Sequence, residues 1–267
     1  MRLEAAGVRF AYRKGEDVLR GVSFAVEEGE VLFVLGPNGC GKTTLLECLA
    51  GIRRPTAGAV LLDGADVHVL AARERARRIG LVPQLHEPAF PYTVLEMVLL
   101  GRAPCLRTLA RPGPEDRREA ERALEAVGIA PLSDRSFTTL SGGERQLALV
   151  ARGLAQGARV LLLDEPDAHL DPFYQGRVLG VARELSRAGA SVVLSTHDPT
   201  SALSHADRVL FLVRGTASPV AAPVEAITGA TLEAAYGVPF SVLQGEDGER
   251  AVALRPRSRG TPLAPGA

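Results

Sequence analysis

The stretch "GPNGCGKT", Gly36 to Thr43, decides the fold class of this chain. It matches the pattern G-x-x-x-x-G-K-[ST], follows a short apolar run and opens a segment of helical character. Its glycines allow consecutive backbone N–H groups to point into one concave anion site, and the helix N-terminus adds a positive dipole end. Lys42 is expected to reach the β- and γ-phosphates of a nucleotide, and Thr43 to bind Mg²⁺. We therefore predict a phosphate-binding loop between a strand and a helix.

The segments around this loop alternate between strand and helix. "GEVLFVL" is a continuous apolar run, which is typical of a buried strand in a parallel sheet, and a helix is expected from about Lys42 to Ala50, stopped by Gly51. "ARVLLLDEP" and "ASVVLSTHDP" predict two more buried strands, and "FYQGRVLGVARELSRAG" a helix between them. This alternation predicts an α/β fold with a mostly parallel sheet.

The remaining segments predict strands in the first third of the chain and helices in its middle. In "GVRFAY" the residues Val8, Phe10 and Tyr12 alternate along a strand, and "AGAVLLDGADV" predicts a hairpin that turns at Asp63-Gly64. Residues 86–156 are predicted to be helical, and "TVLEMVLLG" and "PEDRREAERALEAVG" both end on a glycine at the expected C′ position. The last stretch, "RPRSRGTPLAPGA", is predicted to be disordered.

Composition restricts the class of protein. The chain has 267 residues, 46% of them hydrophobic, and a formal net charge of zero, which fits a globular protein without a chain-wide affinity for nucleic acid. No run approaches the roughly 18 apolar residues of a membrane span, and the start has no signal-peptide core. Cys40, Cys48 and Cys105 show neither metal nor disulfide spacing. We expect a reduced, cytosolic protein that a partner would have to recruit to a membrane.

Polar residues follow the predicted strands where ligands bind in α/β sheets. Asp164 ends a buried strand and is expected to hold Mg²⁺, and Glu165 after it is placed to polarise an attacking water. His197 lies just past the third buried strand, where a catalytic role competes with a structural one. Gln84 ends another apolar run, "GLVPQ", and could reach the metal or the water.

Two residues carry open alternatives. Tyr12 stands 24 residues before Gly36 and is either an aromatic that stacks on adenine or an ordinary strand aromatic. Cys40 is either a small residue that fits the loop or a redox-sensitive thiol with a pKa lowered by the helix N-terminus and Lys42. We favour the small-residue interpretation, because no resolving cysteine is evident.

The stretch "LSGGERQLAL", Leu140 to Leu149, predicts a second helix start suited to an anion. Ser141 is a suitable N-cap, Glu144 completes a capping box, and Gly142 and Gly143 are expected to leave backbone N–H groups uncovered. The chain already has one predicted nucleotide loop, and that loop does not explain a second helix start suited to an anion.

The ordered set Tyr12, "GPNGCGKTT", Gln84, "LSGGERQ", "VLLLDEP", "DAHLD" and His197 resembles the ATP-binding cassette (ABC) ATPases. The resemblance covers about residues 1–240 and implies ATP and Mg²⁺ as cofactors. It implies that Lys42, Gln84, Glu165 and His197 are catalytic. It implies a metal site formed by Thr43, Gln84 and Asp164. It implies that the nucleotide-binding residues are Tyr12, Gly36, Pro37, Asn38, Gly39, Cys40, Gly41, Lys42, Thr43 and Thr44, with Ser141, Gly142, Gly143 and Glu144 serving the nucleotide of a second copy.

The same resemblance implies the domain organisation. Residues 1–240 would be a single ABC ATPase domain with a P-loop NTPase-type, mostly parallel sheet core, an N-terminal antiparallel β subdomain and an inserted α-helical subdomain at about 86–156. Residues 241–267 would be a partly disordered C-terminal extension. Two positions depart from the usual pattern: Glu144 replaces a common Gln, and Asp167 replaces a common Thr or Ser.

The resemblance also implies a function. "FPYTVLEMVLLGRAP", "EPDAHLDP" and "LEAAYGVPFSV" are similar to segments in the ATPases of iron-siderophore, haem and cobalamin importers, with molybdate, zinc or another metal as alternative cargoes. The implied partners are an integral membrane permease dimer that contacts Leu85 to Thr139, a second copy of the chain and, indirectly, an external substrate-binding protein. The implied location is the inner face of the cell membrane. A soluble ABC ATPase of DNA repair or translation is the weaker alternative, because the chain carries one cassette and no excess positive charge.

Overall fold

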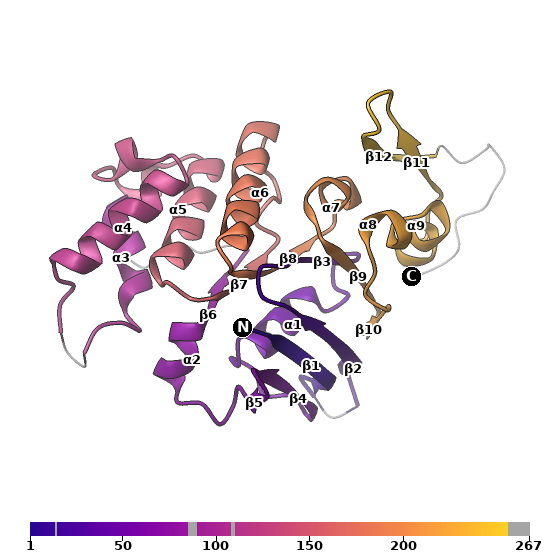
Figure 1. Ribbon diagram of the computed structural model, residues 1–267, viewed down its shortest axis with the longest axis horizontal. Coiled ribbons are helices and arrows are strands. Elements are labelled where there is room, and N and C mark those ends of the chain that lie inside the picture. The colour runs from indigo at the N-terminus through magenta and orange to yellow at the C-terminus, as the bar shows by residue number, and fades with distance from the viewer. Residues whose placement is uncertain (14, 85–89, 108–109, 256–267) are drawn as a thin grey trace.

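A six-stranded sheet forms the centre of the molecule (Figure 1). The computed structural model describes residues 1–13, 15–84, 90–107 and 110–255. The strand order is β10-β9-β3-β8-β7-β6, and the pairs from β9 to β6 are all parallel. The strands are β3 (Val31–Leu35), β6 (Ile79–Val82), β7 (Val160–Asp164), β8 (Ser191–Thr196), β9 (Arg208–Val213) and β10 (Thr216–Ala217). The predicted α/β fold with a mostly parallel sheet is confirmed.

A four-stranded antiparallel sheet lies beside the central one. Its order is β2-β1-β4-β5, with strands β1 (Leu3–Ala11), β2 (Asp17–Val26), β4 (Ala57–Leu62) and β5 (Ala65–Asp66). The predicted turn is confirmed, since Asp63 and Gly64 join β4 to β5 with φ of 50° and 83°. Val8 and Phe10 are buried, as alternation predicts, but β1 ends at Ala11, so Tyr12 lies just beyond the strand.

Helices cover both faces of the central sheet. Figure 1 shows α3, α4 and α5 as a lobe at one end of the molecule and α8 and α9 at the other. The helices are α1 (Lys42–Leu49), α2 (Ala72–Arg78), α3 (Val94–Leu99), α4 (Pro114–Ala126), α5 (Gly142–Ala155), α6 (Pro172–Arg187), α7 (Pro199–His205), α8 (Pro223–Ala226) and α9 (Gly229–Tyr236), with 3-10 turns η1 (Leu100–Arg102), η2 (Ala130–Leu132) and η3 (Phe137–Thr139). The helical middle of the chain is confirmed.

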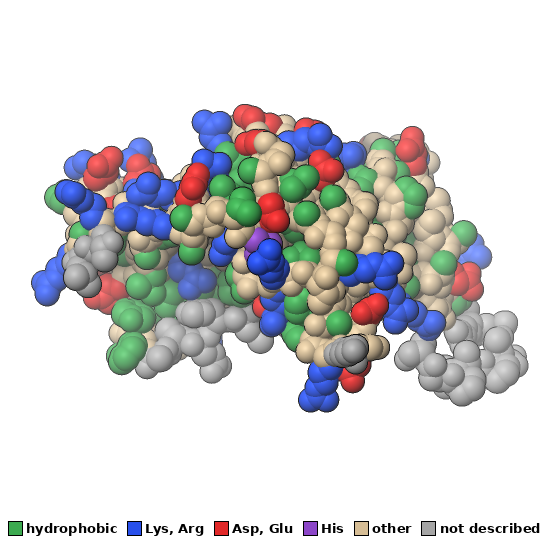
Figure 2. Space-filling model, turned by 90° about the horizontal axis from the view of Figure 1, so that it is seen from below, with side chains coloured by type: hydrophobic (Ala, Val, Ile, Leu, Met, Phe, Trp, Pro, Cys, Tyr) green, Lys and Arg blue, Asp and Glu red, His purple; other side chains and the backbone are tan. Residues whose placement is uncertain are grey.

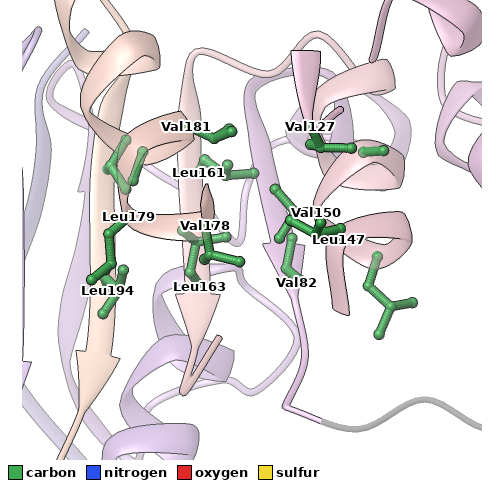
Figure 3. Close-up of a cluster of buried hydrophobic side chains, with 14 of the residues drawn as sticks. Val82, Val127, Leu147, Val150, Leu161, Leu163, Val178, Leu179, Val181 and Leu194 are labelled. Atoms are coloured by element: carbon green, nitrogen blue, oxygen red, sulfur yellow. The ribbon is translucent and has the colours of Figure 1, made fainter. Parts of the chain in front are cut away.

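The two faces of the central sheet belong to two separate cores. Leu161 and Leu163 of β7 pack with Val150 and Val178 of α5 and α6, as Figure 3 shows. Leu162, between them, points to the other face, where α1 and the antiparallel sheet pack. A strand covered on both faces must be apolar at every position, which is why "VLLL" and "VLFVL" carry no alternation.

Three glycines were predicted to end helices, and they differ in conformation. Gly51 follows α1 with φ of 68°, as predicted. Gly128 follows α4 with φ of 77°, so the predicted C′ role is confirmed. Gly101 also stands at the predicted C′ position, directly after the C-cap Leu100 of α3, but it lacks a left-handed φ and continues into η1. A Cβ on Gly101 would lie 2.1 Å from the carbonyl oxygen of Arg152. The glycine is therefore required by the close approach of η1 to α5.

The chain continues after α9 into a hairpin, β11 (Phe240–Gln244) and β12 (Arg250–Leu254). The N–H of Val252 donates to Thr200 Oγ1 at 3.1 Å, and β12 packs against α7. The stretch predicted to be disordered begins at Arg255, and its residues from 256 onward lie outside the described part.

Acidic and basic side chains are intermixed on the face shown in Figure 2, in keeping with the net charge of zero. Among the helices of the described residues, none is long and apolar enough to cross a membrane.

Candidate functional site

The loop between β3 and α1 forms the floor of a cavity of about 400 Å³. Gly41 is the N-cap of α1 with φ of 110°, a left-handed conformation that turns the chain from the loop into the helix. Val18 lines the cavity together with a set that sequence predicted, namely Tyr12, Asn38, Gly39, Gly41, Lys42, Thr43, Thr44, Gln84 and Glu165. Residues from four separate parts of the chain thus meet at one site.

Lys42 closes the loop on itself. Its side chain is 4% exposed, and Nζ donates to the carbonyl oxygens of Gly36 at 2.8 Å and Pro37 at 3.2 Å. Nζ also pairs with Glu165 Oε1 at 3.0 Å. The ammonium group is therefore fixed at the floor of the cavity, where an anion would meet it.

Glu165 contacts two of the predicted polar side chains, which follow two other strands. Gln84 Nε2 donates to Glu165 Oε2 at 3.0 Å, and His197 Nδ1 lies 3.8 Å from the same oxygen. Glu165 has φ of 44°, a left-handed conformation that is strained for a residue with a side chain. Strain of this kind concentrates at functional sites, where the surrounding contacts hold the residue in place. His197 is half exposed at the rim of this group.

Asp164 is held by the neighbouring strand. Ser195 Oγ donates to Asp164 Oδ1 at 2.7 Å, and the two residues pair in register between β7 and β8. Burial raises the pKa of the Asp164 carboxyl, while hydrogen bonds from Ser195 and Thr43 oppose that rise. The Thr43 hydroxyl and the Asp164 carboxylate are hard oxygen donors, so the pair fits Mg²⁺, which takes one or two protein ligands and completes its shell with phosphates and water.

Tyr12 occupies one wall of the cavity. Its hydroxyl lies 3.1 Å from Thr44 Oγ1, and the Phe10 ring meets it edge-on at 5.0 Å between centroids. The Tyr12 side chain is 54% exposed, far more than an ordinary core aromatic. The exposed ring beside the phosphate loop favours the stacking alternative left open by the sequence.

Cys40 is buried beneath the loop and does not line the cavity. Burial raises the pKa of its thiol, and the opposing effect of Lys42 is smaller. Burial likewise raises the pKa of Cys48 to about 12. A protonated, covered thiol is a poor nucleophile, so the structure supports the small-residue interpretation of Cys40.

The stretch from Ser141 to Glu144 starts α5 with the predicted capping box. The Ser141 N–H donates to Glu144 Oε2 at 2.8 Å, and the Glu144 N–H donates to Ser141 Oγ at 3.3 Å. Gly142 is open, but Gly143 is buried, and a Cβ there would lie 2.4 Å from the Tyr174 ring. Tyr174 of α6 therefore packs on Gly143, whereas the space beside Gly142 is open. None of these four residues lines the cavity within the described part of the chain.

Residues 19–168 match the family model described as "ABC transporter". The match spans the nucleotide loop, Gln84 and Glu165, which line the cavity, and also the capped start of α5. The chain belongs to the ABC transporter family. It is the nucleotide-binding ATPase component of that family, and the matched region holds the phosphate loop, Gln84 and Glu165, while Tyr12, Val18 and His197 lie outside it.

This ABC ATPase is similar to a named import protein and to solved structures of ABC transporters. The hemin import ATP-binding protein HmuV of Gloeobacter violaceus is 41% identical over 91% of this chain and 90% of its own length. A solved structure described as a metal-chelate type ABC transporter in an inward-facing conformation has a TM-score of 0.82 at 31% identity, covering 96% of this chain and 98% of the other. A dimeric bacterial ABC transporter cassette has a TM-score of 0.74 at 28% identity, covering 83% and 98%.

Three contacts of this ABC site were not found from the sequence. Ser195 also accepts the N–H of Glu165 on its hydroxyl at 2.9 Å, Tyr174 covers Gly143, and the Arg53 guanidinium lies over the Tyr12 ring. Ser195 stands near the end of the predicted strand in "LSTHD", two residues before His197, and this strand-end position is the signal that could have found it. The sequence carries no comparable signal for Tyr174 or Arg53.

Proposed function

We propose that this ABC ATPase hydrolyses ATP with Mg²⁺ and powers uptake of haem or a related iron chelate through a partner permease. The observation that carries the ATPase part is the position of Glu165, which contacts Lys42 and Gln84 at the cavity wall. The Glu165 carboxylate thereby contacts both the Lys42 ammonium group and the Gln84 amide, which follows a different strand. Once a nucleotide displaces Glu165 from Lys42, this carboxylate would be placed to orient a water toward the bound phosphate.

The residues of the cavity divide the chemistry among them. Lys42 would neutralise the β- and γ-phosphates, which requires it to exchange Glu165 for the nucleotide. Glu165 would then accept a hydrogen bond from the attacking water, and Gln84 and His197 would hold that carboxylate and water in line. Thr43 and Asp164, with the Gln84 amide oxygen, would hold Mg²⁺, which supplies charge neutralisation at the phosphates. Tyr12 would stack on the adenine.

A second copy would complete each site. The start of α5 combines a helix N-terminus with an open Gly142, yet it lies outside the cavity of its own chain. The similarity to a dimeric cassette supports a head-to-tail pair in which Ser141 and its neighbours face the nucleotide of the partner. Two ATP molecules would then lie at one interface.

The cargo and the membrane partner are inferred from the relatives. The relative named for hemin import and the metal-chelate type transporter support an importer of the iron-siderophore, haem or cobalamin group. Phe90 and Leu100 expose 64% and 44% of their surface beside α3, which supports a permease contact there. Residues 85–89 of the predicted contact lie outside the described part. The chain would sit on the inner face of the membrane, served by an external binding protein; another metal cargo or a non-transport role is the alternative.

Replacement of Lys42 tests the nucleotide site. Lys42→Ala should weaken ATP binding by about 10- to 100-fold in calorimetry, because a charge-assisted contact to phosphate is lost. Arg54→Ala, at an exposed basic position outside the cavity, is the control and should bind as the wild type does. Wild-type ATP affinity in Lys42→Ala would falsify the assigned site.

A further inference from the structure

The Tyr12 ring is held on three sides by the protein. Phe10 packs on it in a T-shaped arrangement, the Tyr12 hydroxyl is bonded to Thr44, and the Arg53 guanidinium carbon lies 4.7 Å from the ring centroid. A guanidinium within about 6 Å of an aromatic centroid is in the range of a cation–π contact. The same guanidinium lies 5.7 Å from the Phe10 centroid, so it sits against the Phe10–Tyr12 pair.

Arg53 is itself anchored to the helix that starts at the phosphate loop. Its guanidinium donates to the Glu47 carboxylate, which lies on α1. Its backbone N–H donates to the carbonyl oxygen of Glu47 at 3.1 Å. Both ends of the residue are therefore fixed to α1, whose first residue is Lys42.

The Tyr12 side chain keeps 54% of its surface exposed despite these contacts. Tyr12 lines the cavity and Arg53 does not, although both are described by the structure. The guanidinium therefore contacts the ring without lining the cavity, and the exposed part of the ring remains available to a flat ligand. A ring with one face covered by a cation and its hydroxyl bonded cannot rotate freely, so less entropy is lost when a base stacks on it.

We infer that Arg53 is a positioning residue for the nucleotide base, which sets the orientation of Tyr12 through the Glu47–Arg53–Tyr12 stack. This inference rests on the proposed base-stacking role of Tyr12. This role predicts that Arg53 affects only ligands that carry a base. The affinity for a nucleoside triphosphate should depend on Arg53, whereas the affinity for inorganic tripolyphosphate, which has no base, should not.

The test compares ATP with tripolyphosphate by calorimetry on the full chain. Arg53→Ala should weaken ATP binding by about two- to fivefold and leave tripolyphosphate affinity within twofold of wild type. Arg53→Lys, which keeps the cation, should recover part of the ATP affinity. Glu47→Gln should show a smaller loss for ATP only, since it loosens the anchor of the guanidinium. Arg54→Ala is the matched control and should change neither ligand.

The Tyr12→Ala background separates this inference from the proposed function. If Tyr12 carries the effect, Arg53→Ala should have no further influence on ATP affinity in Tyr12→Ala. Equal losses for ATP and tripolyphosphate, unchanged ATP affinity in Arg53→Ala, or a full effect that persists in Tyr12→Ala would each overturn the role of Arg53. Unchanged ATP affinity in Tyr12→Ala itself would overturn both this inference and the base-stacking role.

Discussion

Asp167 stands at one of the two positions where the sequence departs from its family pattern, and it is buried. Its side chain is 3% exposed, and Thr196 Oγ1 donates to Oδ2 at 2.8 Å. Its other oxygen, Oδ1, has no hydrogen-bond partner among the described residues. The Thr196 contact ties the segment after β7 to the end of β8, immediately before His197. Burial raises the pKa of Asp167; Asp198 adds to that rise, while the Thr196 hydroxyl and His197 oppose it.

A raised pKa in the folded state makes stability depend on pH at this residue. The folded chain keeps the Asp167 proton above the pH at which the unfolded chain has lost it, so stability falls as pH rises through that window. Asp167→Asn removes this loss of stability with rising pH. We expect the variant to be more stable than wild type by roughly 1 kcal/mol near neutral pH, with the difference shrinking toward about pH 4.

Urea unfolding across that pH range is the measurement for Asp167. Asp134→Asn, at an exposed position, is the control and should follow the wild-type curve. Parallel curves for wild type and Asp167→Asn over the whole range would show that the buried carboxyl does not titrate with folding.

At the scale of elements, the contact between η1 and α5 depends on one missing side chain. The backbone of Gly101 approaches the carbonyl oxygen of Arg152 so closely that a Cβ would lie 2.1 Å from it. This contact joins the segment after α3 to the helix that begins at Ser141. Because the obstructing atom is backbone, a side-chain rotation cannot relieve the overlap.

Gly101→Ala should therefore destabilise the fold by about 1–3 kcal/mol, since the two elements must move apart. Gly180→Ala is the matched control: Gly180 lies inside α6, and a Cβ there meets nothing within 4 Å. That control should gain up to about 1 kcal/mol from the better helix propensity of alanine. Urea unfolding of both variants measures the difference, and equal stabilities would contradict the close packing of η1 on α5.

At the scale of the whole molecule, the start of α5 and the cavity lie apart in one copy, and the proposed pairing brings them together. Glu165→Gln should slow hydrolysis strongly while ATP still binds, because the amide keeps the size of the side chain but cannot polarise water. It also removes the charge that pairs with Lys42. With ATP trapped, a stable dimer should accumulate.

Light scattering with and without saturating ATP measures this pairing. The same variant carrying Lys42→Ala is the control and should remain a monomer, since it loses the phosphate-binding cation. A Glu165→Gln chain that stays monomeric at saturating ATP would argue against the shared site.

The sequence by itself determined the features that local interactions control. Backbone dihedrals and capping bonds involve residues a few positions apart, so the turn at Asp63-Gly64 and the cap at Ser141 could be predicted. Strands covered on both faces must be apolar throughout, so "VLFVL" and "VLLLD" were evident as buried strands. The rule that ligands bind at the carboxyl ends of parallel strands predicted that Asp164, Glu165 and His197 would gather at one edge.

Only the tertiary structure decided which of these groups touch, because strand order and register join residues far apart in the chain. Asp164 meets Ser195 because β7 and β8 are neighbours in register. The contacts of Glu165 with Lys42 and of Arg53 with Tyr12 depend on where α1 packs between two sheets. The close approach of Gly101 to α5 could not be predicted for the same reason: it depends on the backbone of α5, and no local pattern encodes it.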